Sequence, residues 1–263
     1  MPPDASLRLG ELIAVAARDH ARTSPPPRGA PFFGLDHRSG SAVGLLGALA
    51  SHGIFRKYER VLDLSAHLGM SSRWLATMLG CTAVATAASV TEARAGSALT
   101  RAAALEEHVH HVAADPAALP FADAGFTHVW SVEAFAFLAD PAPAIAEARR
   151  VLRPGGHLAV QELVCTPGAA GPAIAGATFR SAEAWARLLT RAGFVDLAMR
   201  DMSAQARETA ALLTTARARL EETLDAAARR EAALVTATRQ RAALSACLAS
   251  RSLGLVQILV RRP

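Results

Sequence analysis

Three polar side chains stand near the ends of predicted strands. His67 follows the short apolar run Val61–Leu64, Glu133 follows a later run of the same kind, and Glu162 lies near the end of His157–Val164. Because the carboxyl ends of parallel strands meet at one edge of a sheet, an imidazole and two carboxylates there can act as general bases. The alternative for each side chain is a hydrogen-bonded structural role.

Histidine also occurs in a cluster, EHVHH, which ends at His111. These residue types are common in metal sites, but the cluster begins a predicted strand at its amino end, opposite the edge where ligands bind. His110 and His111 are neighbours on that strand, so their side chains point to opposite faces. We therefore predict no metal site. His37 and His52 are further candidates for a base at the ligand-binding edge.

The stretch Val61–Ala76, VLDLSAHLGMSSRWLA, places an aspartate and a loop between a strand and a helix. In open α/β sheets a nucleotide-like ligand lies at the carboxyl end of such a strand. The N-terminus of the following helix is then directed at the ligand. This stretch predicts a ligand-binding crevice and sets the order of the elements around it.

Strand-like and helix-like segments alternate along the chain. Further strands are predicted at Thr82–Ala87, Val109–Ala114, within Leu119–Val132, and at His157–Val164, Val195–Met202 and Leu253–Arg261. Helices are predicted at Ser39–Gly53, Pro141–Leu152 and Ser181–Ala192, and after Thr82–Ala87 to about Glu107. This alternation is typical of an α/β protein with a doubly wound, mostly parallel sheet, here of seven strands.

Two helical segments lie outside this alternation. Residues 1–31 combine a helical pattern with the proline-rich linker TSPPPRGAP, which predicts a helical arm packed on the domain. Residues 203–252 are nearly all Ala, Leu, Arg, Glu and Thr, and predict two long helices. These helices either cover the sheet edge or form a dimerisation hairpin. The α/β core is then residues 32–202, with its final strand in 253–263.

Composition narrows the classes of protein further. The chain has 263 residues, is 51% hydrophobic and carries a net charge of +5. Lys57 is the only lysine, and the arginines are spread through alanine-rich helices, which disfavours nucleic acid as a partner. The three cysteines form no CxxC pair, which indicates a reducing compartment. The first twenty residues fit neither a secretion signal nor a membrane span, so we expect a soluble cytoplasmic protein.

Several stretches, in order, resemble the class I S-adenosylmethionine (SAM) dependent methyltransferases, the group that includes ubiquinone/menaquinone C-methyltransferases and sarcosine/dimethylglycine N-methyltransferases. VLDLSAHLGMSSRWLA resembles their D-x-G-x-G-x-G motif. Three further stretches resemble later motifs of these enzymes: DPAALPFADAGFTHVWSVEAFAFL, EARRVLRPGGHLAV and FRSAEAWARLLTRAGFVDLAMRDMS. Together these stretches cover roughly residues 60–203. The resemblance implies a Rossmann-like methyltransferase fold, SAM as cofactor and a small-molecule methyl acceptor.

The resemblance also implies which residues touch the cofactor: Asp63, Ser65, His67 and Gly69 in the first loop, and Asp115 and Leu119 after the third strand. Three positions depart from the family pattern. Ser65 and His67 replace glycines, and Ala87 replaces the acidic residue that binds the ribose hydroxyls. A side chain at position 67 costs about 1–3 kcal/mol of backbone strain or fills the ligand's space.

Two functions are consistent with these observations. The first is a SAM-dependent methyltransferase that methylates O, N or C of a small molecule. The second is a methyltransferase-fold protein without normal SAM binding. Such a protein serves as a non-catalytic partner or regulator, or as a pocket for a different ligand or reaction. The helical insertion is a candidate surface for a homodimer or heteromer.

Overall fold

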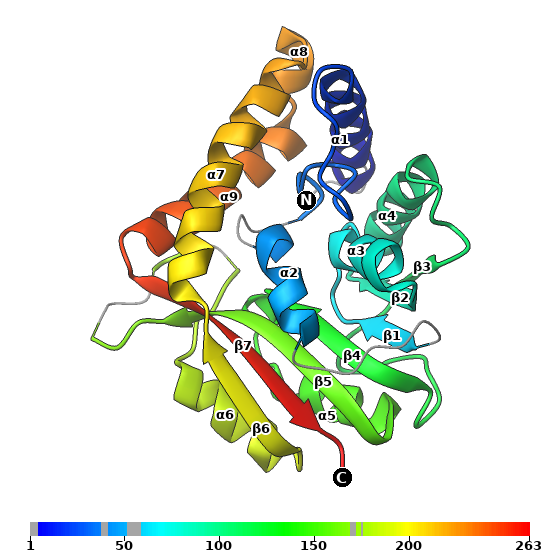
Figure 1. Cartoon of the computed structure of the whole chain (residues 1–263), viewed down its shortest axis with the longest axis vertical. Coiled ribbons are helices and arrows are strands. Elements are labelled where there is room, and N and C mark those ends of the chain that lie inside the picture. Colours follow the sequence, from blue (N-terminus) through cyan, green and yellow to red (C-terminus); the bar gives the residue numbers. More distant parts are fainter. Residues whose placement is uncertain (1–4, 38–41, 52–58, 169–171, 175) are drawn as a thin grey trace.

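The computed structural model describes residues 5–37, 42–51, 59–168, 172–174 and 176–263 (Figure 1). Its seven-stranded sheet has the order β3-β2-β1-β4-β5-β7-β6, and β7 is antiparallel to both of its neighbours. The strands are β1 (Arg60–Asp63), β2 (Thr82–Ala87), β3 (Val109–Ala113), β4 (Phe126–Val132), β5 (Leu152–Cys165), β6 (Val195–Asp201) and β7 (Leu253–Arg261). The predicted doubly wound, mostly parallel sheet is confirmed.

The helices of the sheet region are α2 (Ala42–Ser51), α3 (Met70–Leu79), α4 (Val90–Ala102), the 3-10 helix η1 (Phe135–Phe137), α5 (Ala142–Val151) and α6 (Ala182–Arg191). Two boundaries differ from the prediction. The helix α4 stops at Ala102 instead of about Glu107, since Ala104 adopts the left-handed conformation with φ 54°. The strand β5 begins at Leu152, because the chain is already paired to β4 before His157.

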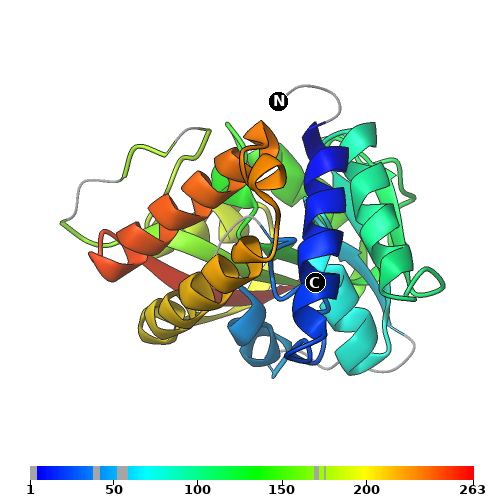
Figure 2. The ribbon, with the colours of Figure 1, turned by 90° about the horizontal axis from the view of Figure 1, so that it is seen from above.

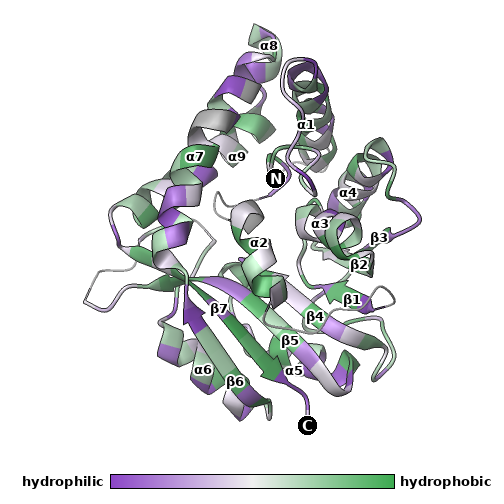
Figure 3. Ribbon diagram, viewed as in Figure 1, coloured by the Kyte–Doolittle hydropathy of each residue, from purple (hydrophilic) through white to green (hydrophobic). Residues whose placement is uncertain are grey.

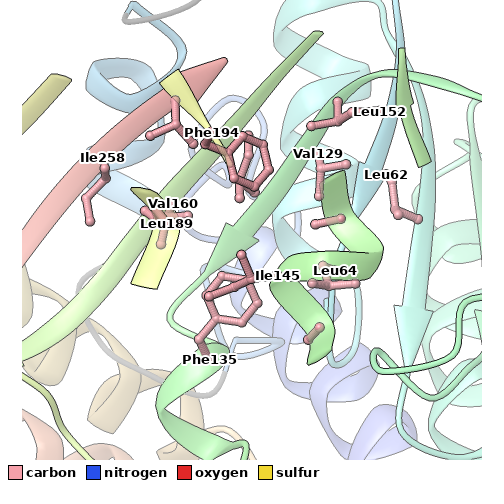
Figure 4. Close-up of a cluster of buried hydrophobic side chains, with 14 of the residues drawn as sticks. Leu62, Leu64, Val129, Phe135, Ile145, Leu152, Val160, Leu189, Phe194 and Ile258 are labelled. Carbon is pink, nitrogen blue, oxygen red and sulfur yellow. The ribbon is translucent and has the colours of Figure 1, made fainter. Parts of the chain in front are cut away.

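A hydrophobic core lies on each face of the sheet. On one face, α5 and α6 pack against side chains of β1, β4, β5 and β7, including Leu62, Val129, Val160 and Ile258 (Figure 4). On the other face, α2 and α3 pack around Trp130. Successive side chains of a strand point to opposite faces, and helices cover both faces of this sheet. Polar groups that are to meet a ligand therefore lie at the carboxyl edge of the sheet.

The arm and the insertion meet above that edge (Figure 2). The arm is α1 (Ala5–Ala21), and the insertion consists of α7 (Ser203–Glu222), α8 (Ala226–Arg229) and α9 (Ala232–Ala249). One apolar cluster joins α1 and α4 to the insertion, through residues that include Leu9, Leu99, Leu224 and Leu234. The insertion therefore packs on its own chain. Coloured by hydropathy, β7 is mostly hydrophobic, whereas α7 carries hydrophilic patches (Figure 3). No helix in the described part of the chain is both long and apolar enough to span a membrane.

Candidate functional site

The loop after β1 follows a left-handed backbone route. Ser65, His67 and Gly69 have φ values of 56°, 53° and 86°. Glycine adopts this conformation freely, whereas a residue with a Cβ is strained there by about 1–3 kcal/mol. Two hydrogen bonds to Thr86 of β2 hold the loop, from the Ser65 amide at 2.8 Å and from the Ala66 amide at 2.8 Å. The backbone route of a glycine-rich loop is kept although two glycines are absent.

Asp63 holds the helix that follows this loop. Its carboxylate is fully buried, and Oδ2 accepts hydrogen bonds from Ser71 Oγ at 2.5 Å and Ser72 Oγ at 2.6 Å. Burial raises the pKa of Asp63 to about 6, against the lowering effect of the two serine hydroxyls. Asp63 lies outside the described cavities and acts on the loop by fixing the start of α3.

His67 binds a carboxylate that the sequence analysis did not single out. Its Nδ1 is paired with Glu92 Oε1, and Glu92 Oε2 accepts a hydrogen bond from the Ala88 amide at 2.8 Å. Glu92 lies in the first turn of α4, where Ser89 accepts a hydrogen bond from its amide at 3.1 Å. The S-x-x-E spacing is a helix-capping signal, which is the only sequence sign of this glutamate. Glu92 thus brings a carboxylate close to the carboxyl end of β2, where Ala87 has none.

Two small cavities lie on either side of His67. One of about 130 Å³ is lined by Ser65 and Glu133, among others, and the other of about 110 Å³ by Glu92 and by α1 and α9. His37 and His67 line both cavities, so these two imidazoles form part of the wall between them. Pockets for drug-sized ligands have volumes of about 300–1,000 Å³, so each cavity alone is small for such a ligand.

Of the two predicted glutamate bases, only Glu133 lines a cavity. It is buried just after β4 with φ 52°, and it accepts a hydrogen bond from Gln161 Nε2 at 2.8 Å. Glu162 instead points into the protein, where its oxygens accept hydrogen bonds from the amides of Leu163 at 2.9 Å and Ala136 at 3.2 Å. Burial, together with the charge of the nearby Glu133, raises the pKa of Glu162 to about 8. Neighbouring residues on a strand face opposite ways, so Gln161 and not Glu162 reaches Glu133.

Asp115 and Leu119 lie outside both cavities. Asp115 is exposed and caps its own turn, accepting a hydrogen bond from the Ala117 amide at 2.9 Å. Leu119 is buried in the main core, and its amide donates to Glu147 Oε2 at 2.8 Å. Arg150 strengthens this contact, because it donates hydrogen bonds both to the Leu119 carbonyl, at 3.0 Å, and to Glu147. These hydrogen bonds join two of the family-like stretches to each other.

Three buried arginines hold the segment that carries His37. They come from α3, α7 and α9: Arg73 donates to Asp36 Oδ2 at 2.5 Å, Arg217 to the Gly34 carbonyl at 2.6 Å, and Arg241 to the Leu35 carbonyl at 3.2 Å. Burial, together with the charge of the neighbouring Arg241, lowers the pKa of Arg217 to about 9. The sequence analysis noted only that the arginines are spread through alanine-rich helices and did not predict that any of them is buried. His52, the other candidate histidine, lies outside the described residues.

His111 packs directly beneath the loop, not away from it as its place in the sequence indicated. A Cβ added to Gly69 would lie 2.4 Å from His111 Cε1, and one added to Gly96 would lie 2.5 Å from it. Its Nε2 lies 2.8 Å from Thr100 Oγ1, and burial lowers its pKa to about 3. Within the described ranges, no three His, Cys, Asp or Glu side chains are grouped to hold a metal ion.

Comparison with known proteins gives a family match for the part of the chain that carries this loop. Residues 62–160 match the model of a methyltransferase domain family. This segment is similar to methyltransferase domains, in agreement with its resemblance to the class I SAM-dependent methyltransferases. The matched range runs from β1 to β5, so it contains the loop, Glu92 and Glu133.

Relatives of the methyltransferase domain match the chain in part. Methyltransferase GfsG of Streptomyces halstedii is 33% identical over 106 residues, which are 40% of this chain and 38% of that protein. The glycine/sarcosine/dimethylglycine N-methyltransferase of Actinopolyspora halophila is 33% identical over 99 residues, 38% of this chain and 18% of that protein. These alignments span less than two fifths of either relative.

Solved structures share the fold over a longer range. The [4+2]-cyclase SpnF superposes with a TM-score of 0.72 at 21% identity, covering 98% of this chain and 96% of that one. A geranyl diphosphate methyltransferase in complex with SAM has a TM-score of 0.65 at 17% identity, covering 84% and 85%. The likeness to SpnF includes the arm and the insertion, because it extends over almost the whole of both chains.

Proposed function

We propose that this chain is a SAM-dependent methyltransferase that acts on a small molecule. The observation that carries the proposal is the backbone of the loop after β1. Ser65 and His67 keep the left-handed conformation that the family's glycines adopt, although strain disfavours it in both residues. A cavity borders this loop on the side of Glu133. The match of residues 62–160 to a methyltransferase domain and the similarity to the glycine/sarcosine/dimethylglycine N-methyltransferase support the same function.

The residues present fit SAM once one side chain moves. The loop backbone is compatible with a close ligand, and the imidazole of His67 is the obstacle, since it stands between two cavities that are each small. We propose that His67 turns away from Glu92 when the cofactor binds, which enlarges the space beside the loop and leaves Glu92 as the carboxylate nearest to the end of β2. Glu92 then takes the ribose-binding role that Ala87 cannot perform. Further cofactor contacts are proposed for Ser65 and Gly69.

Positioning supplies most of the catalysis in this proposal. Bound SAM provides a methyl group on a positively charged sulfur, which needs no activation by acid or base. The chain's own part is to orient the acceptor, to exclude water with α1, α7 and α9, and to accept a proton. Glu133 is the proposed proton acceptor, because it is the buried carboxylate that lines the cavity.

A second candidate function is supported by the His67–Glu92 contact itself. A protein of this fold that no longer binds SAM normally would keep the scaffold while a side chain fills the cofactor's space. It would serve as a non-catalytic partner or regulator, or take a different ligand or reaction. The nearly full-length likeness to a protein described as a [4+2]-cyclase supports the alternative in which the protein carries out a different reaction.

Calorimetric titration with SAM and with S-adenosylhomocysteine decides between the two. We expect micromolar binding to the native chain, about −8 kcal/mol. We expect His67→Gly to bind roughly tenfold more tightly, because the cofactor no longer has to break the hydrogen bond between His67 and Glu92. The control is His108→Gly, at an exposed position just before the amino end of β3, which should match the native affinity.

The outcomes separate cleanly. Binding to the native chain with a gain of about tenfold in His67→Gly supports the methyltransferase. No binding to the native chain, with binding only after His67→Gly, supports the second candidate. No binding to either protein contradicts the proposed use of SAM.

A further inference from the structure

A chain of buried side-chain amides runs from the cavity wall through the sheet to α2. Gln161 Nε2 donates to Glu133 Oε1 at 2.8 Å, and Gln257 Nε2 donates to Gln161 Oε1 at 2.8 Å. Gln257 Nε2 also donates to the carbonyl of Leu45 in α2 at 2.9 Å. Both glutamines are fully buried and face each other in the β5–β7 pair. Buried polar groups of this kind are costly unless they are arranged to bond one another.

The carbonyl of Leu45 determines which atoms donate and which accept along this series of hydrogen bonds. A backbone carbonyl only accepts hydrogen bonds, so Gln257 must present its NH₂ group there, and the same nitrogen reaches Gln161. The oxygen of Gln161 is therefore the acceptor, and its NH₂ group is left to donate to Glu133. The Glu133 carboxylate therefore meets a donor at Oε1, while the Glu133 amide donates to the Gln161 carbonyl at 2.6 Å and holds the two residues together. A donor stabilises the ionised form of a carboxylate.

We infer that Gln161 and Gln257 are positioning residues that hold Glu133 as an anion in the cavity wall, and that the methyl acceptor is a neutral alcohol or amine that presents its O–H or N–H proton to Glu133. This inference rests on the proposed function and names its substrate class. As the acceptor atom forms its bond to the methyl carbon, the methyl–sulfur electron pair stays on sulfur and the acceptor's proton passes to Glu133. The positive charge of the cofactor and the negative charge of Glu133 are lost together, so charge balances.

The charged groups around Glu133 are consistent with this state. Arg217 of α7 lies close enough for the charge of Glu133 to affect it, and it contributes a positive charge. Glu162 of β5 is the neighbouring carboxyl, and burial raises its pKa to about 8, so it stays protonated at neutral pH and does not repel Glu133. His37 and His67 face the same cavity from two loops.

The test is a titration of the full chain with ¹³C-labelled glutamate carboxyls, in which Glu133→Gln identifies the Glu133 signal. Gln161→Leu removes the donor, so the midpoint of the Glu133 titration should rise by about one pH unit, a tenfold change in proton affinity. Gln257→Leu should raise it less, because it only frees the Gln161 amide to turn. Gln205→Leu, on the exposed side of α7, should leave the midpoint unchanged.

An unchanged midpoint in Gln161→Leu overturns the inference; if that variant does not fold, an unchanged midpoint in Gln257→Leu does so. SAM titration of the native chain is run in parallel, so failure of the cofactor proposal is seen separately from the carboxyl result. With labelled SAM, we expect methyl transfer to alcohols and amines. Transfer only to carboxylate acceptors, which carry no proton at neutral pH, overturns the proposed substrate class.

Discussion

Arg73→Leu is expected to lower the free energy of unfolding by about 3–5 kcal/mol, as breaking one side of a buried ion pair does. Arg73 is fully buried in α3 and is paired with the buried Asp36 at 2.5 Å. Its guanidinium also donates to the Leu68 carbonyl at 2.7 Å and to Thr100 Oγ1 at 3.0 Å. The substitution leaves a buried carboxylate without its cation and two buried acceptors without their donor.

Urea denaturation of the native and variant chains measures this change. The exposed Arg219 of α7 is the matched control, since Arg219→Leu should change stability by less than about 0.5 kcal/mol. Adding Asp36→Asn to Arg73→Leu should recover part of the loss, because the stranded charge is then removed. A loss below about 1 kcal/mol in Arg73→Leu would show that Asp36 finds another partner. Since Arg73 also holds the segment with His37, the variant should weaken ligand binding as well.

His111 is expected to make the fold sensitive to acid. Burial lowers its pKa to about 3 in the folded protein, with the charges of Arg73 and His110 acting in the same direction, whereas the ordinary value is 6.5. Between these two values the unfolded chain binds the extra proton, so stability is lost as the pH falls. The loss is about 1.4 kcal/mol for each pH unit, and roughly 2–3 kcal/mol between pH 7 and pH 4.5.

The comparison with His111→Gln isolates this contribution. Glutamine keeps a polar atom near Thr100 Oγ1 but does not titrate. Asp63 and Glu162 work in the opposite direction: burial raises the pKa of Asp63 to about 6 and that of Glu162 to about 8, so both stabilise the fold as the pH falls. These two contributions are common to both proteins and cancel in the difference. Parallel stability curves from pH 7 to 4.5 would contradict the assignment to His111.

Much of the fold was predictable because its signals are local. The apolar runs, the glycine and proline turns and the helical spacing lie within single elements, so the alternation around Val61–Ala76 identified a doubly wound sheet. The position of Glu133 was predictable for the same reason, because the end of a parallel strand defines the ligand edge. The helical insertion was also visible as two helices, with α8 between them as an added turn.

The contacts of the candidate site were decided by the tertiary structure. His67 meets Glu92 across 25 positions of sequence, and Gln257 meets Gln161 across 96. Such pairs depend on strand register and helix packing, which single elements do not encode. Register also turned Glu162 inward and brought Gln161 to Glu133.

The sequence by itself therefore determined the architecture, the family resemblance and the edge of the sheet at which a ligand is predicted, since these follow from periodicity and motif order. Only the tertiary structure decided that Ser65 and His67 keep the glycine route, that Glu92 supplies a carboxylate beside β2, and that buried arginines fix the His37 segment. The physical reason is that a side chain's protonation, strain and partners depend on burial, which arises only when distant elements pack together.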